Sequence, residues 1–235
     1  PFGKAVQVIS PATAEAVGRH FDGEAARFDA IYGTDKGILQ RCVDGLFRGV
    51  IHKRFELTLD WCAEVTGQKI LDAGCGSGRY CVELARRGAD VTGIDLAGSM
   101  VDMSRQAARD AGVEDRCYFE VADVFGWCAP HHFEVSLGIG FFDYIADPGR
   151  VLERIRGVTE GRGIFSFPIR WRLRTPTRWL RLRMRGCPVF FYDRPQVVQL
   201  LADAGWEDVQ ITQLSRDYLV SAGSGLPPAS NESRT

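Results

Sequence analysis

The chain has 235 residues, with 29 basic and 30 acidic side chains, a formal net charge of −1 and 45% hydrophobic residues. This length fits one domain with a full core, and the near-neutral total gives no electrostatic sign of a nucleic-acid partner. The seven cysteines lack the Cys-x-x-Cys spacing of zinc sites, and no apolar run approaches the about 18 residues of a membrane span, so we expect a cytoplasmic enzyme with reduced thiols and no metal.

Residues 1–66 are predicted to be helical and to cover the functional site. Ser10-Pro11 is typical of a helix cap followed by a proline in the first turn. A second helix is expected from Ile38 to Val65, with Gly45 and Gly49 as candidate breaks.

A glycine-rich turn follows the first predicted strand. Residues 69–73 read as a short buried strand, and Gly74, Gly76 and Gly78 come at alternate positions before a helix begins near Arg79. Glycine lets the backbone turn sharply and lets a ligand lie against bare peptide. At the mouth of an α/β sheet this pattern predicts a nucleotide-like cofactor site, although the turn could also serve only as a connection.

Two acidic residues flank this turn in ways that bear on the cofactor. Asp95 ends the next apolar run, about one strand-helix-strand unit downstream, where a carboxylate can accept both ribose hydroxyls. A dinucleotide site needs a third glycine where this chain has Arg79. Asp72, just before the turn, would repel a pyrophosphate but suits a cationic ligand. The pattern therefore disfavours NAD.

Two more apolar runs follow, so that residues 68–168 alternate strands with amphipathic segments. A strand beginning near Arg116 ends at Asp123, which is also a residue that often caps a helical turn. A fourth strand begins near His132 and leads into the loop that contains Phe141 and Tyr144. The alternation predicts a doubly wound α/β sheet.

The motif Asp72-x-Gly74-x-Gly76-x-Gly78, with Asp95 behind it, resembles the class I S-adenosylmethionine-dependent methyltransferases. The resemblance implies a Rossmann-like fold with helices on both faces of the sheet, and S-adenosylmethionine as the cofactor. It implies that Asp123 accepts from the adenine amino group, that the Val124 amide meets an adenine ring nitrogen, and that the fourth strand faces the methionine part of the cofactor. The cofactor-binding residues implied in this way are Asp72, Gly74, Gly76, Gly78, Asp95, Asp123, Val124 and Leu137.

A narrower similarity is to the magnesium-protoporphyrin O-methyltransferases. Residues 20–33, 165–168, 174–176 and 185–192 resemble segments of that group, and together with the cofactor motifs they cover most of residues 20–215. Nothing in the sequence indicates that a porphyrin binds. A surface-glycan or secondary-metabolite pathway fits equally well.

Residues 169–192 form an arginine-rich insertion in the predicted core. Between Ile169 and Arg185 there are seven arginines and no acidic residue. One interpretation is a solvated basic helix, a second is a wall that binds anions through the guanidinium fork, and a third is peripheral contact with anionic lipid. Arg174 and Arg178 are the candidate residues for binding an anionic acceptor.

The remaining elements complete the predicted domain plan. A helix is expected from Pro195 to Ala204 with Gly205 as its stop, followed by strands 209–214 and 217–221 that pair as an antiparallel hairpin at the sheet edge. The plan is a helical cover at 1–66, a core at 67–221 with its insertion at 169–192, and a disordered tail at 222–235.

The candidate catalytic residues lie in the predicted cover. S-adenosylmethionine carries an activated methyl group, so the enzyme has mainly to hold an acceptor atom in line with the sulfur–methyl bond. A hydroxyl acceptor usually needs a general base and a carboxylate does not. His20 is the candidate base and Tyr32 a hydroxyl or aromatic wall near the sulfonium, while Phe141 and Tyr144 are expected to shape the acceptor pocket.

The sequence therefore predicts a methyltransferase that acts on a small anionic molecule, with O-methylation favoured. N- or C-methylation of a small metabolite and a non-catalytic cofactor-binding protein are the alternatives. The oligomeric state and the acceptor are not indicated.

Overall fold

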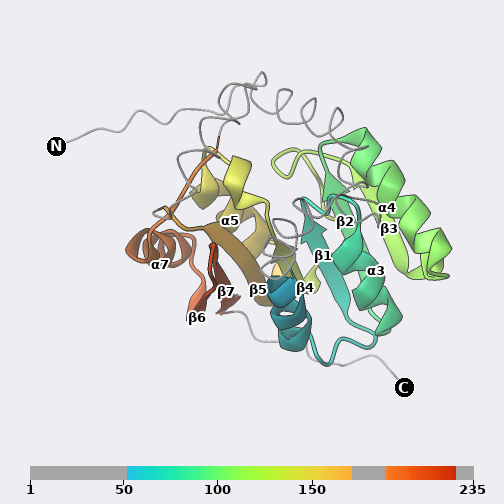
Figure 1. Ribbon diagram of the computed structural model, residues 1–235, viewed down its shortest axis with the longest axis horizontal. Helices are drawn as coiled ribbons and strands as arrows, with labels where there is room; N and C mark the ends of the chain where they lie inside the picture. The colour runs from blue at the N-terminus through green and yellow to red at the C-terminus, as the bar shows by residue number, and fades with distance from the viewer. Residues whose placement is uncertain (1–51, 171–188, 226–235) are drawn as a thin grey trace, which may run out of the picture.

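A seven-stranded sheet forms the centre of the molecule, in a computed structural model that describes residues 52–170 and 189–225 (Figure 1). Residues 52–61 are helical and come before the first strand. The strands are β1 Lys69–Ala73, β2 Asp90–Asp95, β3 Cys117–Val121, β4 Phe133–Gly138, β5 Thr159–Pro168, β6 Glu207–Gln213 and β7 Asp217–Gly223. The helices are α3 Arg79–Arg86, α4 Gly98–Asp110, α5 Pro148–Arg156 and α7 Arg194–Asp203, with short 3-10 turns η1 Glu114–Arg116 and η2 Phe142–Tyr144.

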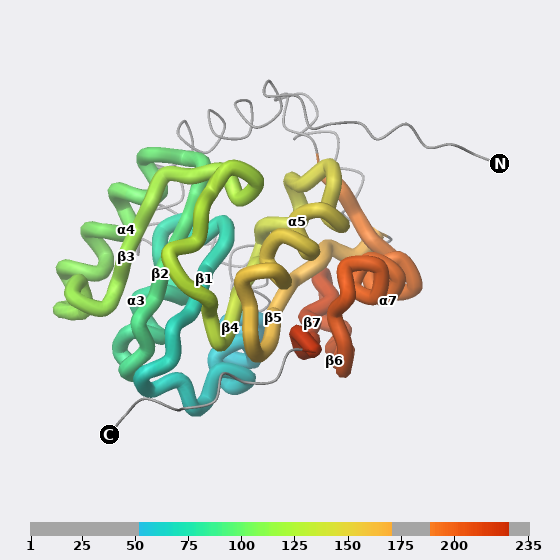
Figure 2. Tube along the Cα trace, turned by 180° about the vertical axis from the view of Figure 1, so that it is seen from behind, coloured from blue at the N-terminus to red at the C-terminus, as the bar shows by residue number. Residues whose placement is uncertain are grey.

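The strand order is β3-β2-β1-β4-β5-β7-β6, which places β3 and β6 at opposite edges (Figures 1 and 2). Strands β1 to β5 are all parallel to one another. Strand β7 is antiparallel to both β5 and β6, and it lies between them. The expected doubly wound sheet and its antiparallel edge hairpin are confirmed.

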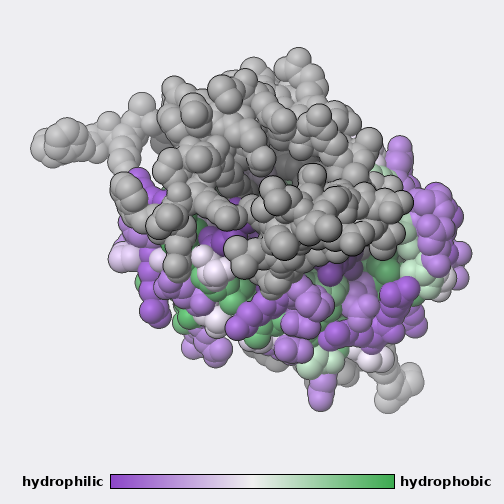
Figure 3. Space-filling model, viewed as in Figure 1, coloured by the Kyte–Doolittle hydropathy of each residue, from purple (hydrophilic) through white to green (hydrophobic). Residues whose placement is uncertain are grey.

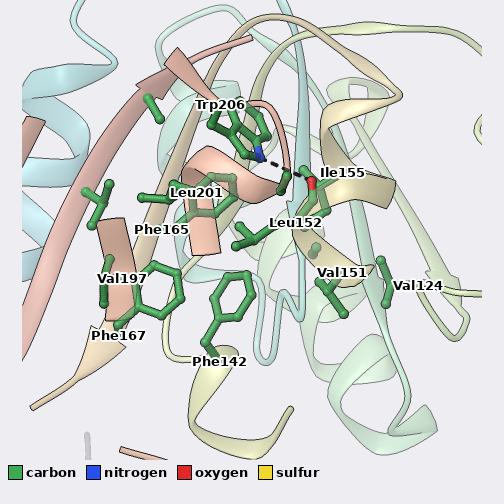
Figure 4. Packing of buried hydrophobic residues seen from close by; sticks show 14 of the residues in the cluster. Val124, Phe142, Val151, Leu152, Ile155, Phe165, Phe167, Val197, Leu201 and Trp206 are labelled. Atoms are coloured by element: carbon green, nitrogen blue, oxygen red, sulfur yellow. Dashed lines mark hydrogen bonds between the residues drawn. The ribbon is translucent and has the colours of Figure 1, made fainter. Parts of the chain in front are cut away.

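Two apolar clusters divide the core between the two faces of the sheet. One contains side chains from α5 and α7, and the other contains side chains from α3, α4 and the helix at residues 52–61. Figure 4 shows the first cluster, in which Phe142, Phe165 and Phe167 lie together and the Trp206 indole nitrogen donates a 3.1 Å hydrogen bond to the Leu152 carbonyl. Helices on both faces leave the carboxyl ends of the parallel strands as the open edge where ligands bind in such folds.

Local signals explain where the last helix begins and ends. Asp193 and Gln196 form a reciprocal capping box at the start of α7, with a proline in the first turn. Gly205 follows the helix with φ of 77°, a conformation that glycine adopts at little cost. The helix therefore matches the predicted one closely.

Some boundaries differ from those expected. The helix at residues 52–61 ends before the predicted Val65, and β7 runs to Gly223, two residues beyond the predicted end. Most of the predicted cover, of the arginine-rich insertion and of the tail lies outside the described residues.

Candidate active site

The glycine-rich turn lies at the carboxyl end of β1, held by backbone hydrogen bonds to the end of β2. The amides of Gly74 and Cys75 both donate to the Ile94 carbonyl, at 2.8 and 3.0 Å. The Ser104 hydroxyl on α4 lies 2.7 Å from the Gly76 carbonyl oxygen, so the turn is also fastened to that helix. Ser104 is a supporting residue that no sequence motif indicated.

The three glycines all have positive φ, but they differ in what an added Cβ would meet. A Cβ at Gly74 would lie 2.5 Å from the Phe141 ring, and one at Gly78 would lie 2.8 Å from Ser104. A Cβ at Gly76 would meet nothing within 4 Å among the described residues. The open space of the turn is therefore at Gly76, while Gly74 and Gly78 permit close packing.

Asp95 reaches from the end of β2 to this open position. Its two carboxylate oxygens accept hydrogen bonds from the amides of Gly76 and Ala97, both at 2.9 Å. A carboxylate oxygen can accept more than one hydrogen bond, so hydroxyl donors suit Asp95 as ligands as well as these amides. The predicted ribose position of Asp95 thus lies directly beside the glycine turn.

Asp72 lies beneath the turn and is almost completely buried. Burial raises the pKa of its carboxyl to about 7, and the nearby charge of Asp95 acts in the same direction, while the Cys81 thiol partly opposes the shift by donating a 3.3 Å hydrogen bond. Burial likewise raises the pKa of Cys81, which therefore stays a neutral donor. A cation bound near Asp72 would favour its charged form.

The other predicted cofactor residues follow β3 and β4. The Asp123 carboxylate accepts from the Phe125 amide at 3.1 Å, so the capping interpretation holds in this structure. Val124 packs against the core cluster on the α5 face. Leu137 is fully buried in the other cluster, and its contact with the cofactor stays a prediction. The adenine contacts of Asp123 and Val124 stay predictions.

Phe141 and Tyr144 both lie in the loop after β4, as predicted. Phe141 is partly buried and packs against Gly74, which places it beside the cofactor turn as well as the predicted acceptor side. Tyr144 is half-buried at the end of η2.

A partly buried charged group near these loops was missed by the sequence analysis. The Arg54 guanidinium, on the helix at residues 52–61, donates to Asp217 at the start of β7 over 2.8 Å. Its terminal nitrogens would lie 3.4 and 3.9 Å from a Cβ at Gly140, in the loop after β4. Burial alone would lower the pKa of Arg54, but the charges of Asp217, Tyr80 and Asp143 together raise it.

Arg54 also meets the helix that follows the glycine turn. Tyr80 in the first turn of α3 lies near enough for the Arg54 charge to act on its pKa, and the Tyr80 ring packs against Phe55 with a centroid distance of 5.0 Å. Arg54 therefore connects the helix before β1, the glycine-turn helix, the loop after β4 and the start of β7. Because its ion-pair partner is 163 residues away along the chain, no spacing pattern could have indicated it.

Four of the candidate catalytic and acceptor-binding residues fall in parts of the chain that the structure does not describe. His20, Tyr32, Arg174 and Arg178 lie outside the described residues. Of the described histidines, His132 precedes β4 and lies 3.3 Å from Glu160, and His52 pairs with Glu56 on an exposed helix face. Within residues 52–170 and 189–225, no group of three or more His, Cys, Asp or Glu side chains could hold a metal ion.

The described surface gives no sign of a membrane-spanning segment. Among the helices in the described part of the chain, none is both long and apolar enough to cross a bilayer. Polar and apolar residues are interspersed over the described part of the face in Figure 3.

Comparison with known proteins agrees with this geometry. Residues 70–163 match a family model described as a methyltransferase domain. The chain is 32% identical over 158 residues to the tRNA 5-carboxymethoxyuridine methyltransferase of Escherichia coli K12, which covers 63% of this chain and 55% of that protein. It is 32% identical over 109 residues to the ubiquinone biosynthesis O-methyltransferase of Aeromonas salmonicida, covering 45% of this chain and 46% of that protein. The chain thus spans about half the length of these curated relatives.

The fold has a close counterpart among solved structures. Magnesium protoporphyrin IX methyltransferase from Synechocystis PCC 6803, with bound S-adenosylhomocysteine, superposes with a TM-score of 0.70 at 19% identity, over 90% of this chain and 99% of that one. At this identity the likeness is one of fold. The expected resemblance to class I methyltransferases is confirmed.

Proposed function

We propose that this chain, which carries a methyltransferase domain in the class I fold, transfers a methyl group from S-adenosylmethionine to an oxygen atom of a small anionic molecule. The observation that carries the proposal is the pairing of the Asp95 carboxylate with the Gly76 amide, at 2.9 Å, where the turn has open space. A carboxylate held there suits the two hydroxyls of a ribose.

The described residues bind and orient the cofactor in this proposal. Asp95 accepts from the ribose, Asp123 and the Val124 amide hold the adenine, and the buried Asp72 carboxylate attracts the cationic methionine end. Bound S-adenosylmethionine supplies a sulfonium with an activated methyl group. The protein must then place the acceptor in line with that methyl, and such positioning contributes about 7–11 kcal/mol in well-oriented reactions.

Two observations support the proposed acceptor. The relatives include an O-methyltransferase of ubiquinone biosynthesis, which supports oxygen as the methylated atom. The seven arginines at residues 170–185 support an anionic acceptor, with Arg174 and Arg178 as its proposed ligands and His20 and Tyr32 as the proposed catalytic groups.

A second acceptor class, RNA, is favoured by one observation, the tRNA methyltransferase relative. The near-neutral net charge weighs against it. Methyl transfer to RNA should therefore be measured beside transfer to small carboxylates and phenols.

Binding experiments separate the cofactor hypotheses. In calorimetry, we expect micromolar binding of S-adenosylmethionine and S-adenosylhomocysteine, on the order of −8 kcal/mol, and no binding of NAD. Binding of NAD alone would instead support an oxidoreductase. Methyl-labelled S-adenosylmethionine then distinguishes an enzyme from a non-catalytic binding protein, because only an enzyme transfers the label to an acceptor.

A further inference from the structure

The Phe141 ring has a position that neither the motifs nor the acceptor hypothesis explains. It packs against Gly74, the first glycine of the cofactor turn, so closely that a Cβ there would lie 2.5 Å from a ring carbon. Phe141 reaches this point from the loop after β4, three residues beyond the end of that strand. The ring therefore spans from the end of β4 to the end of β1.

The order of the strands indicates which part of the cofactor passes this ring. The sheet runs β3, β2, β1, β4. In the proposed binding mode the adenine lies at Asp123 after β3 and the ribose at Asp95, at the end of β2. The next part of the molecule, the sulfonium, then falls over the ends of β1 and β4.

The ring is supported from behind by residues that cannot easily move. Phe142 is fully buried and meets Phe141 edge to face, with ring centroids 5.4 Å apart. Phe142 in turn lies 4.6 Å from the Phe167 ring and 5.7 Å from the Phe165 ring, all in the cluster drawn in Figure 4. Phe141 is itself only partly buried, so one part of its ring remains available to a ligand.

We propose that the Phe141 ring contacts the sulfonium and makes the site prefer S-adenosylmethionine to its demethylated product, an inference that rests on the proposed function. The face of an aromatic ring attracts a cation within about 6 Å of its centre. During transfer the acceptor oxygen forms a bond to the methyl carbon while the carbon–sulfur bond breaks, and that electron pair stays on sulfur. The sulfur is then neutral, and the attraction is lost when the product forms.

The test compares ligands that differ in charge at this one position. S-adenosylmethionine and sinefungin are positively charged there, and S-adenosylhomocysteine is neutral. Dissociation constants of all three are measured by calorimetry for the full chain, for Phe141→Leu and Phe141→Tyr, and for Phe142→Leu as the matched control. If Phe141→Leu is unfolded by circular dichroism, Phe141→Met replaces it, since methionine also lacks the ring.

We expect Phe141→Leu to weaken the two charged ligands about fivefold more than S-adenosylhomocysteine, and Phe141→Tyr to keep the wild-type ratio. Phe142→Leu loosens the support behind Phe141 but keeps the Phe141 ring, so it should change the charged and neutral ligands by nearly the same factor. If Phe141→Leu lost the same factor of affinity for all three ligands, the inference would be overturned, and the ring would contribute only apolar contact. A wild-type protein that binds none of the three overturns the proposed function, and the inference with it.

Discussion

Asp95 offers the sharpest test of the cofactor site, because one carboxylate holds two backbone amides and the proposed ribose position. Asp95→Ala removes its 2.9 Å hydrogen bonds to Gly76 and Ala97. Hydrogen bonds to charged groups contribute about 1.5–3 kcal/mol each, but Asp95 is only half-buried, so we expect the free energy of unfolding to fall by about 2 kcal/mol in total. In a chain of this size that corresponds to a Tm lower by about 4–8 °C.

Asp95→Ala should weaken cofactor binding by more than its effect on stability alone would suggest. Loss of the ribose acceptor should weaken S-adenosylhomocysteine by tenfold or more in calorimetry, since about 1.4 kcal/mol corresponds to a factor of ten. A ligand lacking one ribose hydroxyl should lose less affinity in Asp95→Ala than in the wild type, because the partner of that hydroxyl is already gone.

The control is Asp90→Ala, at the other end of the same strand. Asp90 is exposed and pairs with Arg116 at 3.0 Å, so its loss should cost less than about 1 kcal/mol and leave cofactor affinity unchanged. A folded Asp95→Ala protein that binds S-adenosylhomocysteine as tightly as the wild type would refute the assignment of Asp95.

Three further outcomes are expected. Gly76→Val places a side chain where the described residues leave space and also strains the backbone, since Gly76 has a φ of 54°, so we expect a destabilised protein without detectable cofactor binding, and normal binding would mean that the turn is only a connection. Asp72 has a pKa of about 7 in the folded state against about 4 in the unfolded chain, so between these pH values the folded state binds more protons than the unfolded one. The stability that the protonated Asp72 contributes is therefore fully present below about pH 4 and is lost as the pH rises through about 7. In urea unfolding, the stability of Asp72→Asn relative to wild type should increase from about pH 5 to 8. Affinity for S-adenosylhomocysteine should rise over the same range only in the wild type. If the stability or affinity of the two proteins changed in parallel with pH, the prediction would be wrong. Replacing Arg174 and Arg178 with Gln should raise the acceptor KM at least tenfold and leave cofactor affinity within about twofold, and an unaltered KM would indicate a solvated helix.

Local patterns predicted the elements around the glycine turn well, because each is encoded within a few residues. The glycine turn after β1, Asp95 at the end of β2 and the capped helix α7 all have short-range signals. A carboxylate at the end of a strand and glycines in a turn occupy positions that the neighbouring residues define.

The features that were missed depend on contacts between distant parts of the chain. Arg54 meets Asp217 only because β7 returns to the middle of the sheet, and Phe141 meets Gly74 only because β4 lies beside β1. Leu137 was assigned to the cofactor from the family resemblance; the alternation of side chains between the faces places its side chain in the core, and its contact with the cofactor stays a prediction. Sequence spacing sets that alternation but does not say which face carries the ligand.

The place of β7 has a consequence for how this protein is made. Strand β7 is the last strand described along the chain, yet it fills an interior position beside β5. Until the ribosome has released Asp217–Gly223, β5 has an open edge whose residues 163–168 are all buried in the finished structure. An apolar strand with unpaired amides is a site for aggregation. The nascent chain therefore carries this exposed edge until almost all of the described sequence has been synthesised. We expect a chaperone that binds the nascent chain to bind at this edge of β5.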